Sequence, residues 1–91
     1  MKVEFDPDKR NLTLQERGLD FCDAPLVFDD SEVTFLDSRF DYGEDRWLTF
    51  GWLNNVAVNV VWTWRGENRR IISMRQMHDE EVENVGLDRP R

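Results

Sequence analysis

The chain has 91 residues, of which 40 % are hydrophobic and 12 % aromatic, enough for one small core. Its net charge of −7 argues against broad, non-specific binding of nucleic acid, which depends on cationic side chains that displace counterions. With one cysteine, an acidic N-terminal segment and no apolar run of membrane-spanning length, we expect a single cytoplasmic domain over residues 1–91, without disulfide, signal peptide or membrane span.

The N-terminal segment predicts a short strand followed by a helix. Residues 3–5 alternate in polarity, as a strand does. Asp6 then begins a helix, because an aspartate side chain accepts from free backbone amides and Pro7 suits the first helical position. We expect this helix to end near Glu16, since Gly18 can adopt the left-handed conformation that follows a helix end.

A second helix is expected to reach about Phe28. A start at Asp20 would place Pro25 inside the helix, where it removes a hydrogen bond and clashes with the preceding turn. A start at Asp23 places the same proline in the first turn, where it is tolerated. We therefore favour the later start.

The second half of the chain predicts four strands, at residues 33–36, 46–52, 56–64 and 69–76. Polar turns at residues 37–45, 54–55 and 65–68 separate them, and successive hairpins of this kind form an antiparallel meander. The third of these strands has apolar residues on both sides, which is typical of a central position.

Residues 77–85 predict a short final helix, with Gly86 after its end and Pro90 preventing its continuation. The order of elements predicts an α+β fold: an antiparallel sheet with two N-terminal helices packed on one face and a short C-terminal helix. The other face would then be available, and we expect the functional site there.

Charge is unevenly distributed along the chain. The net charge is −8 over residues 1–45, +4 over residues 46–78 and −3 over residues 79–91. Four arginines fall in one run of eleven residues: Arg65, Arg69, Arg70 and Arg75. Arginine has a fixed charge and a planar donor fork that matches phosphate oxygens, which suits RNA binding and stabilisation of a charged phosphoryl transition state. The simpler interpretation is a solvated, charge-rich strand pair.

The geometry of a strand constrains this run of arginines. Strict alternation places Arg69 and Arg75 on one face and Arg70 on the other. Arg70 and Arg75 can then share a site only if one of them lies at a strand end or beside a bulge. Arg65 lies in the turn and can reach either side.

Other site chemistries find little support in the sequence. His78 is the only histidine and Cys22 the only cysteine, so neither a zinc motif nor a Cys/His nucleophile pair is indicated. The five glycines are scattered and form no phosphate-binding loop. We interpret the acidic run at residues 79–81 as a solvated face, and we expect no metal and no cofactor.

Residues spread over nearly the whole chain form a series in a fixed order, here called the landmark series. They are Val3-Glu4-Phe5-Asp6, Lys9, Asn11, Gly18, Phe21, Val27-Phe28-Asp29-Asp30, Glu44, Arg46, Gly51, Thr63, Arg65-Gly66, Arg70-Ile71-Ile72-Ser73, Arg75 and Glu81. In these residues the chain resembles the BrnT family of toxins from type II toxin-antitoxin systems, which are small ribonucleases with a RelE-like fold. The block from Arg70 to Arg75 is the most specific part of the resemblance.

The resemblance implies RNA cleavage that inhibits translation, without a metal and with the ribose 2′-hydroxyl as nucleophile. It also implies neutralisation by an antitoxin, BrnA-like and encoded nearby, that dimerises and binds DNA, so that DNA is contacted only through the antitoxin. Catalytic roles fall on Arg65, Arg70 and Arg75 for phosphate binding and transition-state charge, on Lys9 as an assisting group, and on Glu81 as a base or as a residue that orients an arginine. RNA binding falls on Arg46, Arg69 and Ser73.

The chain also differs from the usual pattern of that family. Glu16-Arg17-Gly18 stands where Lys-His-Gly is usual, and the final helix is acidic rather than basic. These differences favour a second hypothesis, a catalytically weakened binding module of the same fold whose main role is to hold a protein partner. A third hypothesis is a small structural or regulatory domain whose arginines only pair with its carboxylates.

Overall fold

A computed structural model describes residues 1–29 and 31–88, so Asp30 of the landmark series and Pro90, expected to stop the last helix, lie outside the described residues. The elements are β1 (Val3–Phe5), α1 (Pro7–Arg17), the 3₁₀ helix η1 (Phe21–Leu26), β2 (Val33–Leu36), β3 (Trp47–Leu53), β4 (Val56–Arg65), β5 (Asn68–Gln76) and α2 (Asp79–Val85). The predicted positions of the strands and of the first and last helices are confirmed, with ends that differ by one or two residues.

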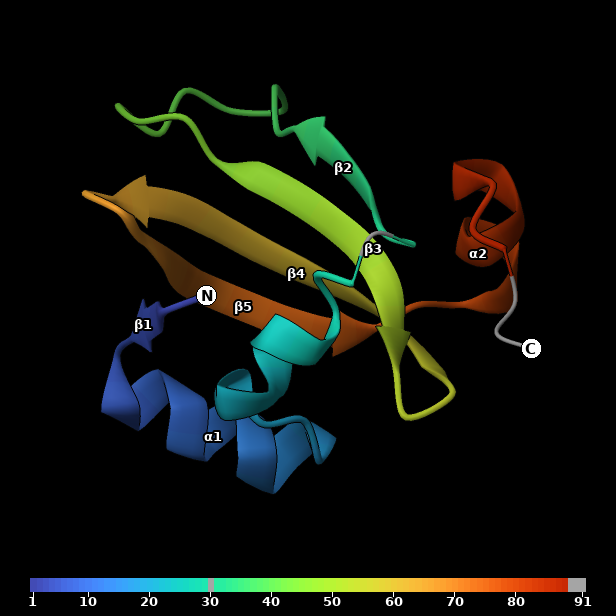
Figure 1. Ribbon diagram of the computed structural model, residues 1–91, viewed down its shortest axis with the longest axis horizontal. Coiled ribbons are helices and arrows are strands. Elements are labelled where there is room, and N and C mark those ends of the chain that lie inside the picture. Colours follow the sequence, from blue (N-terminus) through green and yellow to red (C-terminus); the bar gives the residue numbers. More distant parts are fainter. Residues whose placement is uncertain (30, 89–91) are drawn as a thin grey trace.

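The strands form one five-stranded sheet in the order β1-β5-β4-β3-β2 (Figure 1). The four strands of the second half are antiparallel neighbours, and β4 is central, as predicted. The prediction of a wholly antiparallel sheet is wrong, because β1 pairs with β5 in parallel, with Val3 opposite Arg69 and Phe5 opposite Ile71. Alternation of polarity identifies a strand but not a partner 66 positions away in the sequence.

Helix α1 has the predicted ends. The Asp6 side chain accepts from the Asp8 amide at 2.9 Å, Pro7 is the first helical residue, and Gly18 follows the last turn with φ of 69°. No residue of α1 is fully buried, so burial of its own side chains stabilises the helix little. Its contacts with β5 and η1 hold it in place.

The expected second helix is a short 3₁₀ segment, so the prediction of two N-terminal α-helices is wrong, as is the start at Asp23. Segment η1 begins at Phe21, and the Asp20 side chain caps it by accepting from the Cys22 amide at 2.9 Å. The fully buried residues Phe21, Ala24 and Val27 recur every three positions, which matches the three-residue turn of a 3₁₀ helix. The burial period therefore agrees with the 3₁₀ form, and Pro25 lies inside this segment.

Two hydrophobic clusters lie on opposite faces of the sheet. On one face, η1 covers the sheet so closely that a Cβ added at Gly51 would come within 2.7 Å of Val27 Cγ1. On the other face, Val82 of α2 packs in a cluster with Phe50 and Ala57. Figure 1 shows α1 and η1 together on one side of the sheet and α2 apart from them. The second face is therefore partly covered, by α2 at one end.

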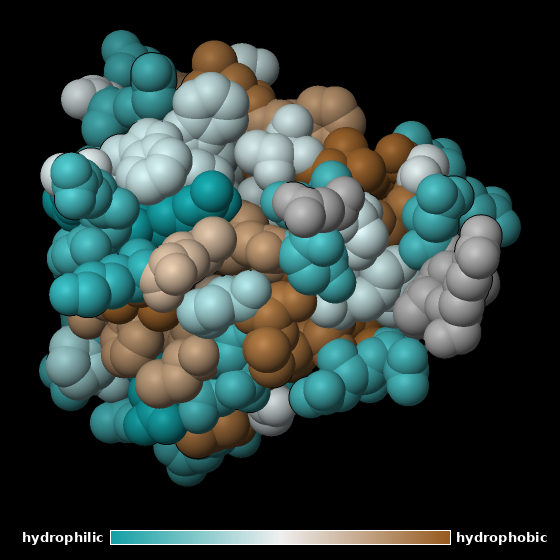
Figure 2. Space-filling model, viewed as in Figure 1, coloured by the Kyte–Doolittle hydropathy of each residue, from teal (hydrophilic) through white to brown (hydrophobic). Residues whose placement is uncertain are grey.

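Large hydrophobic side chains remain exposed along β2 and the segment after it, among them Phe35, Leu36 and Phe40. Figure 2 shows hydrophobic residues along the top of the molecule, where β2 lies in this view. Within residues 1–29 and 31–88, no helix is long and apolar enough to cross a membrane.

Candidate functional site

A bulge in β5 sets the direction of the arginine side chains. Val61 of β4 lies opposite Ser73, but the next residue, Trp62, lies opposite Ile71. Ile72 is therefore an extra residue in β5, without an opposite partner in β4. From this point the alternation of β5 shifts by one position.

Arg70 and Arg75 point to the same face of the sheet as a result. Arg70 lies opposite Thr63 and Arg75 opposite Asn59, and these two β4 residues are four apart in a regular strand, so their side chains share a face. Strict alternation had placed the two arginines on opposite faces, and the bulge reverses that placement. Four residues of strand still separate them by about 13 Å.

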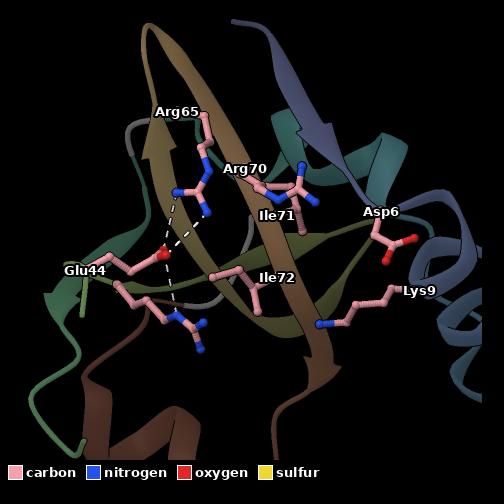
Figure 3. A pocket seen from close by; sticks show the side chains of 8 residues that line it. Asp6, Lys9, Glu44, Arg65, Arg70, Ile71 and Ile72 are labelled. Carbon is pink, nitrogen blue, oxygen red and sulfur yellow. Dashed lines mark hydrogen bonds and ion pairs between the residues drawn. The ribbon is translucent and has the colours of Figure 1, made fainter. Parts of the chain in front are cut away.

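A pocket of about 180 Å³, here called the arginine cleft, lies between the start of α1, β5 and the β2–β3 connection. Its lining residues are Asp6, Lys9, Glu44, Arg46, Arg65, Arg70, Ile71 and Ile72. Figure 3 shows Lys9 extending from α1 toward Ile72 and the Arg65 guanidinium directed at Glu44. Four cationic side chains thus face two acidic ones in a chain that is acidic overall.

Glu44 lies between two of these arginines. Its carboxylate accepts from both terminal nitrogens of Arg65, at 3.3 and 3.4 Å, and its Oε2 lies 3.9 Å from Arg46 Nε. The Arg65 hydrogen bonds are the main reason that the pKa of Glu44 lies below its usual value. The Arg46 guanidinium also lies 4.1 Å from the centre of the Tyr42 ring, which fixes its position beside the carboxylate.

The other cations of the arginine cleft are held less tightly. Arg70 Nη1 lies 3.5 Å from a carboxylate oxygen of Glu4, a long ion pair between side chains that are each about one third exposed. Lys9 has no hydrogen bond or ion pair to any residue in the described part of the chain. Both groups can therefore bind an incoming anion without breaking a strong internal contact.

Arg75 lies outside the arginine cleft and is bound to the start of α2. Its guanidinium donates to both carboxylate oxygens of Glu81, at 2.9 and 2.6 Å, and Glu81 also accepts from the His78 amide at 3.1 Å. These bonds, the arginine pair first, lower the pKa of Glu81 to about 2, and the same pair raises the pKa of Arg75. Glu81 is thus a firmly held carboxylate that fixes both Arg75 and the start of α2.

Arg69 lies on the opposite face from Arg70. Its guanidinium carbon is 4.2 Å from the centre of the Phe28 ring, 4.4 Å from that of Trp62 and 5.1 Å from that of Trp64. Burial among these rings lowers the pKa of Arg69. The residue occupies an aromatic cage and does not share the arginine cleft.

The structure therefore brings together four of the residues singled out from the sequence: Lys9, Arg46, Arg65 and Arg70. Arg75 and Glu81 lie farther along the same face, Ser73 lines a neighbouring pocket, and Arg69 lies on the other face. Sequence reasoning did not assign a site role to Glu44 or Asp6. Glu44 was detectable, because it stands two positions before Arg46 in a Gly-Glu-x-Arg block.

The arginine cleft combines the groups that phosphodiester chemistry requires. Its guanidinium groups match the oxygens of a phosphate, and the carboxylate of Glu44 lies beside two of them. Within the described residues, no group of three or more His, Cys, Asp or Glu side chains is arranged to hold a metal ion.

Comparison with known proteins agrees with this chemistry. A family model described as "Ribonuclease toxin, BrnT, of type II toxin-antitoxin system" matches residues 5–81, a range that contains every residue of the arginine cleft. No curated protein matches the chain.

Proposed function

The chain belongs to the BrnT family of ribonuclease toxins of type II toxin-antitoxin systems, and from this premise we propose that it cleaves RNA in the arginine cleft. Membership of such a system implies an RNA target and a cognate antitoxin. The observation that carries the proposal is that Lys9, Arg65 and Arg70 line one pocket together with Glu44.

The proposed reaction is attack of a ribose 2′-hydroxyl on the adjacent phosphorus. This bond forms as the bond to the 5′-oxygen of the next nucleotide breaks, leaving a 2′,3′-cyclic phosphate and a free 5′-hydroxyl. Because the nucleophile belongs to the substrate, the protein has to supply only a proton acceptor, a proton donor and cations for the phosphoryl oxygens. No metal is needed in this proposal.

Each of these roles has a candidate in the arginine cleft. Glu44 accepts the 2′-hydroxyl proton, Arg65 and Arg70 bind the non-bridging phosphoryl oxygens, and Lys9 donates a proton to the departing 5′-oxygen. The guanidinium groups are suited to charge stabilisation rather than proton transfer, because arginine side chains in proteins keep their proton. Lys9 is the better donor, since it has no internal partner in the described part of the chain. Arg46 contributes to RNA binding beside Glu44.

Substrate binding activates Glu44 in this scheme. In the free protein Arg65 holds the carboxylate and lowers its pKa, which makes it a weak base. When Arg65 turns to a phosphate, that hydrogen bonding is lost and the pKa of Glu44 rises toward its usual value. The carboxylate thus becomes a better proton acceptor at the moment when the phosphate is in place.

Glu81 suits a positioning role better than the role of a base. Its pKa of about 2 is far from the operating pH at which general bases work best. It lies at 2.6 Å from Arg75 and orients that guanidinium toward the same face as Arg70. Arg75, about 13 Å along the strand, is then placed to contact RNA beyond the scissile phosphate.

A second candidate function is a binding module with weakened catalysis. It is favoured by the differences from the usual family pattern and by the acidic surface of the chain. The ion pairs of Arg65 with Glu44, Arg70 with Glu4 and Arg75 with Glu81 would weaken catalysis further, and they also fit the third hypothesis, of arginines that only pair with carboxylates. In this case the toxin fold mainly holds its antitoxin.

For the active ribonuclease, we propose a BrnA-like antitoxin that is encoded nearby and that makes the only contact of the complex with DNA. While this antitoxin is absent, the protein cleaves RNA in the cytoplasm and so inhibits translation.

Incubation of the purified protein with single-stranded RNA tests the cleavage proposal directly. We expect products with 2′,3′-cyclic phosphate and 5′-hydroxyl ends in the presence of a metal chelator. Arg65→Ala and Arg70→Ala should each lower the rate by about 10²–10³-fold, as loss of one transition-state donor does. Arg65→Lys should restore only part of it, because lysine keeps the charge but not the donor fork.

Lys2→Ala is a matched control for Lys9→Ala, because Lys2 is an exposed lysine outside the arginine cleft. Only the Lys9 variant should slow cleavage and relieve the growth arrest that we expect on expression without antitoxin. Full activity of the combined Arg65, Arg70 and Arg75 alanine variant would contradict the roles proposed for these arginines. Absence of cleavage with tight antitoxin binding would favour the binding module.

A further inference from the structure

A second pocket adjoins the arginine cleft, and the two share Lys9 and Ile72. It has a volume of about 260 Å³ and is lined by α1 through Leu12, Thr13 and Glu16, and by β5 through Ile72 and Ser73. This is below the range of about 300–1,000 Å³ that holds drug-sized ligands, so the pocket has room for one small group. We call it the side pocket.

The side pocket lies where, among residues 1–29 and 31–88, part of one edge of β5 has no strand beside it. Strand β1 pairs with β5 only at residues 69–71, and from Ile72 onward α1 lies along that edge instead. Arg17 fixes the end of the helix there, since its Nη1 donates to the Met74 carbonyl at 2.8 Å. This hydrogen bond fixes the position of α1 relative to β5, and with it the two walls of the side pocket.

Helix α1 directs an unpaired acceptor into this space. Lys9, Thr13 and Glu16 follow one another at spacings of four and three residues, so they lie on one face of the helix, toward β5. Unlike Glu4, Glu44 and Glu81, each bound to an arginine, Glu16 has no hydrogen bond or ion pair within the described residues. Its two carboxylate oxygens are available to a ligand.

We propose that the side pocket binds the base of a nucleotide that flanks the scissile phosphate, and that Glu16 selects guanine there. This inference rests on the proposed cleavage of RNA in the arginine cleft. A phosphate bound between Lys9 and Arg70 would leave the attached nucleoside beside Ile72, which lines both pockets. Leu12 and Ile72 provide apolar contacts for the faces of the base.

The choice of guanine follows from hydrogen-bonding patterns. On its Watson–Crick edge guanine has two adjacent donor groups, the N1–H and the 2-amino group, which match the two oxygens of one carboxylate. Adenine, cytosine and uracil each present a donor beside an acceptor, so one carboxylate oxygen would face a lone pair. Single-stranded RNA is read on such exposed edges, and a bidentate contact discriminates by about 1–3 kcal/mol, or roughly 5- to 150-fold.

The test uses short single-stranded RNAs that differ only in the bases on either side of the cleaved bond. We expect the wild-type protein to cleave next to guanine about tenfold faster than next to any other base. Replacing that guanine by inosine, which lacks the 2-amino group, should remove most of the advantage. Glu16→Gln should shift the preference toward adenine, because an amide pairs an acceptor with a donor. The matched control is Glu80→Gln, an exposed glutamate of α2 that should leave the base preference unchanged.

Binding of the same RNAs with 2′-deoxy nucleotides, which cannot be cleaved, provides a readout independent of catalysis. Tighter binding of the guanine form than of the inosine form, lost in Glu16→Gln, supports the side pocket even if no RNA is cleaved. Cleavage without base preference, or a Glu16→Gln profile identical to that of the wild type, would overturn the inference and leave the proposed ribonuclease function standing. Equal binding of guanine and inosine forms would overturn it as well.

Discussion

Arg70 and Arg75 lie on one face of β5 although five positions separate them, because Ile72 between them is an extra residue in a bulge. Such a bulge redirects side chains without interrupting the strand, and it is common next to functional sites. In this chain it places two arginines on one face of the sheet, Arg70 in the arginine cleft and Arg75 farther along β5. RNA lying along β5 could contact both.

The two arginines should nevertheless differ in their effect on cleavage. Arg70→Ala removes a cation from the arginine cleft and is expected to lower kcat about 10²–10³-fold. Arg75→Ala removes a contact about 13 Å away, so we expect mainly a higher KM. Steady-state kinetics on one RNA measures both parameters, and an equal loss of kcat in the two variants would contradict this division.

Glu44→Gln should abolish the proton acceptor while keeping the shape of the arginine cleft. We expect the cleavage rate to fall by about 10²–10⁴-fold, the usual contribution of general acid–base catalysis. The acidic limb of the pH–rate profile, which reports protonation of the base, should disappear in this variant. Glu67→Gln, in the exposed turn between β4 and β5, is the control and should keep both rate and profile. A Glu44 variant with wild-type kcat would remove this residue from the mechanism.

The Arg75–Glu81 pair makes stability depend on pH. The pKa of Glu81 falls from 4.5 to about 2 in the folded chain, so the carboxylate stabilises the fold above pH 4.5. This contribution is lost as the pH falls from about 4.5 to about 2. We expect Glu81→Gln to lower the free energy of unfolding at pH 7 by about 1 kcal/mol, after allowance for solvent screening, and to have little effect at pH 2.

Urea unfolding of both proteins across this pH range measures the difference. Glu80→Gln alters the neighbouring residue of the same helix, and it should leave the curve unchanged. A Glu81 variant that is destabilised equally at pH 2 and pH 7 would show that the cap, and not the charge, is responsible.

Gly51 allows η1 to approach the sheet. An added Cβ would lie 2.7 Å from Val27 Cγ1 and 3.0 Å from the Val27 carbonyl oxygen, so Gly51→Ala should cost about 1–3 kcal/mol, as overpacking does. Val27→Ala in the same chain removes the side-chain clash but not the backbone one. We therefore expect the double variant to lose less than the sum of the two single variants, as measured by urea unfolding.

Arg69→Ala should reduce stability more than activity. The guanidinium contacts three aromatic rings, Phe28, Trp62 and Trp64, and loss of these contacts is expected to cost about 1–2 kcal/mol. RNA binding by Arg69, expected from the sequence, would require an RNA path over the aromatic face. A folded Arg69→Ala variant with lower RNA affinity would support that path. Unchanged RNA affinity would show that Arg69 has only a structural role in the aromatic cage.

Local signals in the sequence predicted the elements well. Asp6, Pro7 and Gly18 specify the ends of α1 through capping and backbone conformation, which involve only neighbouring residues. Alternating apolar residues specified the four consecutive strands and the central place of β4. The grouping of Arg65 with Arg70 was expected from the family resemblance, since the local pattern left Arg65 free to reach either side.

Features that depend on distant partners were not predictable in the same way. The parallel pairing of β1 with β5 joins the two halves of the chain, and no local pattern encodes it. Isoleucine is common in regular strands, so the identity of Ile72 does not indicate a bulge. The bulge is defined only by the pairing of β5 with β4. The site role of Glu44 likewise depends on a long connection that returns beside Arg65.

The pairing of β1 with β5 also bears on how the cell makes this protein. Synthesis proceeds from the N-terminus, so Asp6 and Lys9 emerge from the ribosome long before Arg65 and Arg70. A growing or truncated chain therefore lacks half of the arginine cleft, and the first and last strands must meet before the cleft is complete. Such late closure of distant segments is slow compared with local folding. The proposed cleavage in the arginine cleft would therefore begin only after the whole sheet has formed.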